Sequence, residues 1–197
     1  MTTLGTARDR AKAERTDAIL VAAAELFGAR GYSGVSLEEI GSAVGVSGPA
    51  VYRHFAGKQA LLGALLIGVS ERLVAGGLDV ASRTDPGVER MRALVAFHVE
   101  FAIGNAPVIR VQDRDLAHLS DEGRSDVRRL QRAYIELWID ALSTLVDEDR
   151  DALRLRVQAC FGLLNSTPHS TSAAVRARVD TAHLLSAMAL AALLAES

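Results

Sequence analysis

The sequence predicts an all-α protein in which short helices are followed by long ones. The long periodic segments are rich in Ala, Leu, Arg and Glu, which favour helices, and no segment keeps the two-residue alternation of a half-buried strand. Gly and Pro cluster in the first sixty residues and become sparse after Lys58, so the later helices should run for roughly 15 to 25 residues. We therefore expect two domains, residues 1–57 and residues 58–197.

The composition narrows the function classes. The chain has 22 Lys and Arg against 24 Asp and Glu, a formal net charge of −2, so any nucleic-acid binding must come from a local surface. Cys160 is the only cysteine, which excludes an internal disulfide and favours a reducing cytoplasm. Asp17 and Glu25 interrupt the apolar stretch that a signal peptide needs, and residues 184–195 are too few for the roughly 18 to 20 of a membrane-spanning helix. We expect a cytoplasmic protein with no membrane partner.

The first two helices are marked by apolar stripes and a cap. One stripe predicts a helix over residues 15–30, and Gly31 can supply the left-handed residue that ends it. Ser36 and Glu39 have the spacing of a capping box, which predicts the start of a second helix. Gly45 then permits the tight turn before a steeply crossing third helix. The two buried stripes are Ile19, Ala22, Ala23, Leu26 and Phe27, and then Leu37, Ile40 and Val44.

The third helix is predicted over about residues 47–55, with Ser47 as its cap and Pro49 in its first turn. A helix this short needs the support of the first two. We expect its inward side to be Val46, Val51 and Phe55, and its outward side to be Gly48, Ala50, Tyr52, Arg53 and His54. Small residues followed by polar and aromatic ones suit a close approach to a DNA groove, and the helix N-termini near Ser36, Ser47 and Lys58 are candidate phosphate contacts.

Several short motifs keep a fixed spacing within residues 15–66. They are Ala23-Ala24-Glu25-Leu26-Phe27, Gly31-Tyr32, residues 35–40, residues 43–47, and Val51-Tyr52-Arg53-His54-Phe55 followed by Lys58 and Leu62. In these motifs the segment resembles the DNA-binding domain of the tetracycline-repressor (TetR) family of bacterial regulators. The resemblance implies an N-terminal three-helix helix-turn-helix DNA-binding domain, followed by a larger helical domain for ligand binding and dimerisation.

The resemblance also assigns roles within the helix-turn-helix. It implies that Tyr52, His54 and Lys58 bind phosphates, and that Ser36 does so across the groove. The residues nearest the bases would be Ser47, Gly48, Pro49, Ala50 and Arg53. Gly48 departs from the larger polar residue often found at its position, which leaves Arg53 as the candidate for reading a guanine; a solvated or phosphate-bound arginine is an equal alternative.

Four longer helices are expected in the second domain. Asp85-Pro86 predicts a helix start with proline in the first helical position, and further helices are expected over residues 125–146, 153–164 and 175–194. The last of these is rich in Ala and Leu on several faces, so it needs cover on more than one side, from its own chain or from a partner subunit. The resemblance implies a four-helix bundle made by the last two helices of two chains. Such a homodimer would read two half-sites about 34 Å apart in a pseudo-palindromic operator.

The resemblance further implies a cavity among the middle helices for a small-molecule effector. Aromatic residues with a few polar neighbours are the candidates to line it, although each taken singly is more often an ordinary core residue. They are Phe97, His98, Phe101, Tyr134, Trp138, Phe161 and Asn165. A separate group of arginines either meets an anionic ligand or lies solvated beside nearby carboxylates. It consists of Arg110, Arg114, Arg124, Arg128, Arg129 and Arg132.

No catalytic motif accompanies these features. The sequence has no HExxH, GxSxG, GxxxxGK or CxxC, and Cys160 lies in an apolar stretch where a structural thiol is expected. We therefore expect no enzyme, no cofactor and no metal. The expected function is a ligand-responsive, sequence-specific transcriptional regulator, a repressor that a small molecule releases from its operator. The alternative is a DNA-binding regulator or a DNA-organising protein with no effector.

Overall fold

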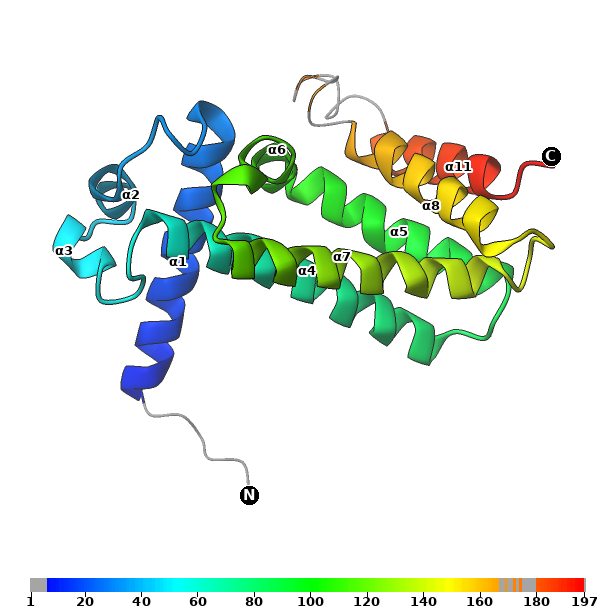
Figure 1. Ribbon diagram of the computed structural model, residues 1–197, viewed down its shortest axis with the longest axis horizontal. Helices are drawn as coiled ribbons and strands as arrows, with labels where there is room; N and C mark the ends of the chain where they lie inside the picture. Colours follow the sequence, from blue (N-terminus) through cyan, green and yellow to red (C-terminus); the bar gives the residue numbers. More distant parts are fainter. Residues whose placement is uncertain (1–6, 167–168, 170–171, 173, 175–179, 197) are drawn as a thin grey trace.

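The computed structural model describes residues 7–166, 169, 172, 174 and 180–196, and in this part of the chain it contains helices and no strand. A head of three helices lies at one end of an elongated molecule (Figure 1): α1 (Ala7–Arg30), α2 (Leu37–Ala43) and α3 (Gly48–Val51). The prediction of an all-α fold is confirmed.

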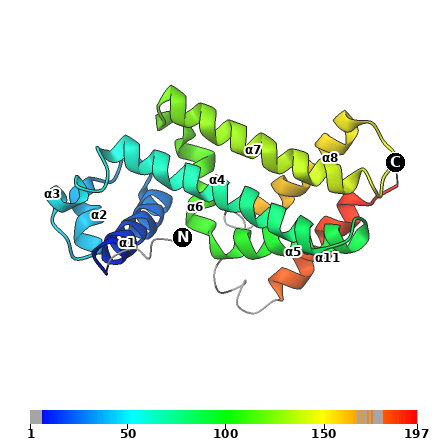
Figure 2. The ribbon, with the colours of Figure 1, turned by 90° about the horizontal axis from the view of Figure 1, so that it is seen from below.

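The remaining helices form a body that extends away from the head. They are α4 (Lys58–Arg83), α5 (Val88–Gly104), α6 (Ala106–Asp115), the short 3-10 helix η1 (Leu116–His118), α7 (Asp121–Leu142), α8 (Arg150–Asn165) and α11 (Thr181–Leu193). Helices α4 and α7 run along the length of the body, and α6 lies where the body meets α1 (Figures 1 and 2). Helices α8 and α11 lie side by side at the end far from the head.

Two hydrophobic cores hold the molecule together. The first joins α1, α2 and α3 to the first half of α4 and to residues of α6 and α7, and the second joins α5, α7, α8 and α11. Leu73 of α4 packs against both cores. Helix α4 is long and apolar enough to cross a membrane, and its place between two cores explains that composition. The first core extends past residue 57, so the head is packed onto the body rather than linked to it loosely.

Several element boundaries differ from the sequence prediction. Helix α7 covers Asp121–Leu142 rather than residues 125–146, and α8 covers Arg150–Asn165 rather than residues 153–164. Helix α1 begins at Ala7 rather than at residue 15, because the polar residues 7–14 form exposed helical turns that no apolar stripe announces. Helix α3 is α-helical over Gly48–Val51 only and continues as turns. The helix expected at Asp85-Pro86 begins at Val88, after Gly87 with its φ of 122°. For the last helix, expected over residues 175–194, residues 175–179 lie outside the described residues.

Helix α6 was not predicted at all. Asn105 and Pro107 mark a break in the sequence, but this break ends α5 and at once begins α6, with a bend of 84° between the two helical segments. Pro107 fits the first turn of a helix because the amide hydrogen that proline lacks has no partner there. When Asn and Pro are treated only as signals that end a helix, a short helix that begins at the same residues is missed.

Candidate DNA-binding surface and ligand pocket

The start of α2 is fixed by the predicted capping box. The Ser36 hydroxyl accepts a hydrogen bond from the Glu39 amide at 3.2 Å, and the Glu39 carboxylate accepts one from the Ser36 amide at 2.8 Å. The same carboxylate pairs with Arg30 at the end of α1, at 2.8 Å. The hydrogen bond from the Ser36 backbone and the Arg30 guanidinium lower the pKa of Glu39 to about 2. This carboxylate therefore ties α2 to α1 at any physiological pH.

Helix α3 is seated by its apolar side and by two close approaches. Val51 and Phe55 are buried, as expected. A Cβ on Gly41 would lie 2.9 Å from the Val46 carbonyl oxygen, so only glycine lets the turn close here. The expectation that Gly48 faces outward is wrong, because Gly48 is buried and a Cβ built on it would lie 3.0 Å from the side chain of Glu38. Position 48 therefore faces α2.

Four of the nine residues predicted to meet DNA are exposed on α3 or immediately beside it. Ser47, Pro49 and Arg53 are exposed, and Tyr52 exposes 54% of its surface. Few aromatic side chains in a folded protein are exposed to this extent. Ala50 is half-buried. Because Gly48 and Ala50 offer no polar group, Arg53, in the turn that follows α3, supplies the long, exposed polar side chain of this region.

His54 is half-buried, and one of its ring nitrogens is already occupied. The Thr16 hydroxyl donates to the Lys12 carbonyl oxygen at 3.0 Å and lies 2.9 Å from His54 Nδ1. A hydroxyl has a single proton, so His54 Nδ1–H must donate to the Thr16 oxygen. The neutral imidazole then has no proton on Nε2. His54 can donate to a phosphate oxygen only as the imidazolium.

Lys58 supports the loop between α1 and α2. Its ammonium donates to the carbonyl oxygens of Tyr32 at 3.0 Å and Val35 at 2.9 Å, and it lies 4.4 Å from the centre of the Tyr32 ring. The other face of Tyr32 is engaged by His118 of η1, in a stacked contact at 4.6 Å. Two of the three ammonium protons are therefore used within the protein, and one remains for a phosphate. Ser36 likewise has its hydroxyl engaged in the cap.

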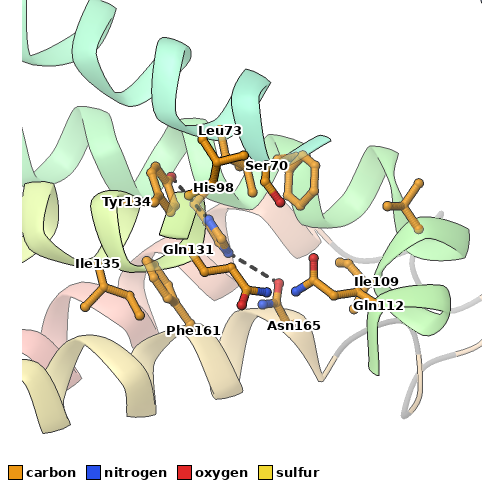
Figure 3. Close-up of a pocket in the computed structure, with 13 residues that line it drawn as sticks. Ser70, Leu73, His98, Ile109, Gln112, Gln131, Tyr134, Ile135, Phe161 and Asn165 are labelled. Atoms are coloured by element: carbon orange, nitrogen blue, oxygen red, sulfur yellow. Dashed lines mark hydrogen bonds between the residues drawn. The ribbon is translucent and has the colours of Figure 1, made fainter. Parts of the chain in front are cut away.

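A cavity of about 210 Å³ lies in the body, between α4, α5, α6, α7 and α8 (Figure 3). Five of the seven residues predicted to line a ligand site lie on its wall: His98, Phe101, Tyr134, Phe161 and Asn165. Two do not. The Phe97 ring covers Gly76, where a Cβ would be 2.2 Å from the ring. The fully buried Trp138 packs behind the wall, edge-on to His98 and Phe161.

Sequence reasoning missed three polar residues of this cavity, Ser70, Gln112 and Gln131. Ser70 interrupts the apolar stripe of α4, and its hydroxyl donates to the Leu66 carbonyl oxygen at 2.8 Å. Gln131 precedes Tyr134 by one helical turn on the inward face of α7. A polar residue within an apolar stripe is therefore the signal that marks both. Gln112 had no such signal, because it lies on the unpredicted α6.

His98 is the centre of a polar chain across the cavity wall. Its Nε2 lies 3.3 Å from Asn165 Oδ1, and its Nδ1 lies 3.3 Å from the Tyr134 hydroxyl. Since the amide oxygen only accepts, Nε2–H donates to it and Nδ1 accepts from Tyr134. Burial lowers the pKa of His98 to about 4 and raises the pKa of Tyr134. Both side chains are neutral at pH 7.

The arginines considered as anion partners lie elsewhere. None of the six lines the cavity. Arg124 pairs with Asp121 at 3.0 Å and Arg129 pairs with Asp126 at 3.1 Å, on the surface of α7. Arg124, Arg128 and Arg132 border a shallow open depression instead. Among the residues that the structure describes, no arginine is therefore placed to meet an anionic ligand in the cavity.

Helix α6 touches the cavity with one side and the head with the other. Gln112 lines the cavity, while Pro107 lies so close to α1 that a Cβ on Gly28 would be 2.9 Å from its α-carbon and its carbonyl oxygen. Arg114 donates to the Phe27 carbonyl oxygen at the end of α1 and pairs with the buried Asp115 at 3.0 Å. Helix α6 is thus in direct contact with both the cavity and α1.

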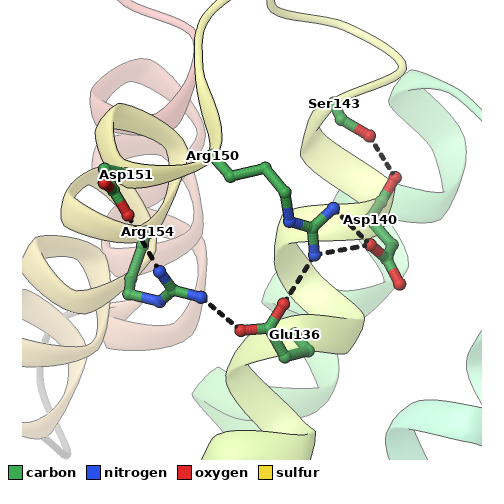
Figure 4. Close-up of polar contacts among 6 residues, drawn as sticks. All are labelled: Glu136, Asp140, Ser143, Arg150, Asp151 and Arg154. Carbon is green, nitrogen blue, oxygen red and sulfur yellow. Dashed lines mark hydrogen bonds and ion pairs between the residues drawn. The ribbon is translucent and has the colours of Figure 1, made fainter.

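An ion-pair network joins α7 to the start of α8 (Figure 4). Glu136 accepts from both Arg150 and Arg154, Arg150 also pairs with Asp140 at 3.1 Å, and Arg154 pairs with Asp151 at 3.1 Å. The two guanidinium groups lower the pKa of Glu136. These side chains are largely exposed, so each pair contributes little to stability by itself. Together they fix the direction in which α8 leaves the loop.

The outer faces of α8 and α11 expose large apolar side chains. Leu155 of α8 is 68% exposed, and Leu184 and Met188 of α11 are 50% and 46% exposed. Each lies opposite the side of its helix that packs into the second core. Arg156 holds the end of α11 to α8 by donating to the Ala195 carbonyl oxygen at 2.8 Å. Three of the seven large apolar residues that are exposed in the described part of the chain thus gather on this pair of helices.

Among the described residues, no group of three or more His, Cys, Asp or Glu side chains is placed to hold a metal ion. Cys160 is buried in the second core, and burial raises the pKa of its thiol to about 12. Such a thiol is protonated and a poor nucleophile.

Two family models match the chain. Residues 19–65 match the model of bacterial regulatory proteins of the tetR family, and residues 84–169 match the model of a tetracyclin repressor-like C-terminal domain. The first match contains the second half of α1, all of α2 and α3, and the start of α4. The second contains the helices that surround the cavity, apart from α4.

Curated relatives and solved structures agree with these models. The HTH-type transcriptional activator FasR of Mycolicibacterium smegmatis is 36% identical over 88 residues, which are 45% of this chain and only 40% of the activator. The HTH-type transcriptional repressor KstR2 of Mycobacterium tuberculosis is 26% identical over 154 residues, 78% of this chain and 77% of the repressor. A TetR-family transcriptional regulator from Bordetella parapertussis has the same fold, with a TM-score of 0.81 at 23% identity over 91% of this chain and 94% of that one.

Proposed function

The chain belongs to the tetR family of bacterial regulatory proteins and is a DNA-binding transcriptional regulator; we propose that it is a cytoplasmic homodimeric repressor, which a small molecule releases from a pseudo-palindromic operator. The observation that carries this proposal is the position of α6, which borders the cavity at Gln112 and contacts α1 at Gly28 and Phe27. Repression rather than activation is favoured because the match to a repressor covers 78% of the chain and the match to an activator 45%.

The proposed DNA contacts divide into two kinds. Tyr52 and Arg53 are exposed on α3, while His54 and Lys58 are each partly committed to contacts within the head. We assign Tyr52, His54 and Lys58 to phosphates, with Ser36 and Ser47 at the helix N-termini. Arg53 is assigned to a base edge, beside Gly48, Pro49 and Ala50. Phosphate contacts position the protein and base contacts specify the sequence.

The proposed release mechanism follows from the packing of α6. A ligand that fits the cavity only when α6 is displaced shifts the population toward that arrangement, by as much as its affinity differs between the two. Because α6 is tight against α1, the head moves with it. In a dimer this changes the spacing of the two α3 helices, which must match one turn of DNA. A coupling of roughly 1–3 kcal/mol is typical of such switches.

Arg53→Ala should relax base preference at one position in each half-site and cost about 1–3 kcal/mol of affinity for the selected operator. Tyr52→Phe should weaken binding to all DNA sequences alike, because it removes a hydroxyl that donates a hydrogen bond to a phosphate. Binding-site selection from random DNA, followed by anisotropy titrations, measures both effects. Arg83→Ala is the matched control, since Arg83 is exposed at the far end of α4. Unchanged preferences in the Arg53 variant would remove the assignment of this residue to a base.

Gly28→Ala is expected to lower the free energy of unfolding by about 1–2 kcal/mol, because its methyl group would collide with the backbone of Pro107. It should also reduce operator affinity in the absence of any ligand, since α6 and α1 are forced apart. Chemical denaturation and operator titration measure the two effects.

Gly63→Ala is the control for this variant. The only atom near its Cβ is a Leu119 methyl at 3.9 Å, so the change should stabilise α4 by about 0.5–1 kcal/mol through helix propensity. If Gly28→Ala behaves like Gly63→Ala in both measurements, the contact between α1 and α6 is not the link proposed here.

A DNA-organising protein without an effector is the second candidate. It is favoured by the lack of polar groups at Gly48 and Ala50, which leaves few side chains for base readout. The two candidates differ in salt dependence and specificity. A steep salt slope with little difference between selected and random DNA would support the organising protein.

A further inference from the structure

We propose that the cavity takes a small, uncharged, flat aromatic molecule of one or two rings, with an amide or ketone group on its edge. This inference rests on the proposed function, because it names the class of effector for the site described above. Four features of the cavity carry it: its volume, the parallel rings on its wall, the lack of charged side chains and a cluster of side-chain amides.

The volume sets the size of the ligand. The cavity holds about 210 Å³, while an engineered protein cavity of about 150 Å³ binds benzene and drug-sized ligands need roughly 300 Å³ or more. A substituted single ring or two fused rings therefore fit the space. The nucleotide part of a larger ligand would have to lie outside the cavity.

The wall selects a flat ligand. The rings of His98, Tyr134 and Phe161 are nearly parallel, with interplanar angles of 10° to 22° and centres 4.6 to 5.8 Å apart. Trp138 contacts His98 and Phe161 edge-on from behind, at 84° and 78°, which holds the rings in this orientation. Parallel rings favour an offset stack with another flat ring.

The electrostatics select a neutral ligand. Within the part of the chain that the structure describes, the lining residues include no Asp, Glu, Lys or Arg. The histidine and the tyrosine on the wall are neutral at pH 7, because burial lowers the pKa of His98 and raises the pKa of Tyr134. A carboxylate or an ammonium group placed here would lose water without gaining a counter-charge.

Amide groups supply the polar contacts. The side chains of Gln112 from α6, Gln131 from α7 and Asn165 from α8 come together at one end of the cavity (Figure 3). Asn165 is bonded to His98, whereas the amides of Gln112 and Gln131 have no bonding partner among the described residues. A ligand that displaces water from these groups must replace its hydrogen bonds. An amide or ketone edge does so without a charge.

The same arrangement explains how binding is sensed. Gln112 lies on α6, between Pro107 and Arg114, which contact α1. A ligand bonded to Gln112 and stacked on Phe161 therefore bridges α6 to α8. Gln131, on α7, orients the ligand without touching α6.

Isothermal titration calorimetry with three probes of one ring system tests the inference: 2-naphthamide, 2-naphthoate and naphthalene. We expect 2-naphthamide to bind with a Kd on the order of micromolar and 2-naphthoate to bind at least roughly tenfold more weakly. Gln131→Leu and Gln112→Leu should each weaken 2-naphthamide roughly tenfold, because an apolar side chain cannot bond its amide. Naphthalene binding should stay unchanged in both variants, which controls for folding and for cavity shape.

Equal or tighter binding of 2-naphthoate overturns the inference, as does the failure of all three probes to bind, or an unchanged affinity for 2-naphthamide in both glutamine variants. Operator affinity measured with each probe separates this from the proposed function. Binding of 2-naphthamide without any change in operator affinity would contradict ligand control and leave the ligand class standing. Binding and operator release by 2-naphthoate alone would contradict the ligand class and leave ligand control standing.

Discussion

A Leu155→Glu, Met188→Glu double variant is expected to be monomeric and to bind its operator roughly 10²–10⁴-fold more weakly than the parent protein. The two side chains are 68% and 46% exposed on the outer faces of α8 and α11. We propose that a second copy covers these faces in a four-helix bundle. Two carboxylates in each copy would then be buried against their symmetry mates without counter-ions, which is strongly unfavourable.

The large loss of operator affinity follows from linkage rather than from any change in the head. When two heads are joined, the second half-site is bound at a high effective concentration, and separated heads lose that advantage. Each monomer would still carry an intact α3. The affinity for a single half-site should therefore be nearly unchanged, while the affinity for the full operator should fall to about that for one half-site.

Leu78→Glu is the matched control, because Leu78 is 57% exposed and belongs to α4 rather than to α8 or α11. It should remain dimeric and bind the operator normally. Sedimentation velocity and fluorescence anisotropy measure mass and affinity for all three proteins. A double variant that sediments as a dimer would show that the proposed interface lies elsewhere.

The sequence was informative where packing follows periodicity. The capping box of Ser36 and Glu39 is present as predicted, and the stripe from Ile19 to Phe27 is the buried side of α1. Each of these signals is local, since it depends on residues within two helical turns. The all-α fold and the family could therefore be predicted from one sequence.

Signals that depend on a distant neighbour were missed or misjudged. Gly48 looks like a solvent-facing residue until α2 places Glu38 against it. Lys58 looks like a free cation, yet two backbone carbonyls that lie more than twenty residues away share its ammonium. Gln112 could not be assigned to the cavity because no helix was predicted over the residues that form α6. Contacts between elements are set by tertiary packing, which periodicity does not encode.

The wild-type protein should lose about 3 kcal/mol of stability between pH 7 and pH 4 through His98 alone. In the unfolded chain this imidazole has an ordinary pKa of 6.5, whereas in the folded protein burial lowers it to about 4. Above pH 6.5 both states are neutral and the full stability is present. As the pH falls below 6.5, His98 binds a proton in the unfolded chain but stays neutral in the folded protein. The free energy of unfolding therefore decreases until the pH reaches the pKa of His98 in the folded protein.

His98→Gln isolates this effect, because glutamine can still bond Tyr134 and Asn165 but does not titrate. Urea denaturation at fixed protein concentration, repeated from pH 7.5 to pH 4, gives the free energy of unfolding of both proteins. Carboxylates such as Glu39, whose pKa is lowered to about 2, stabilise the fold above pH 4.5 and lose that contribution only below it, equally in the two proteins. The free energy of unfolding of the wild-type protein minus that of His98→Gln should therefore be constant above pH 6.5 and should decrease steadily below it. Parallel curves would mean that His98 takes up its proton without leaving its place between Tyr134 and Asn165, and that the cavity wall tolerates a charge.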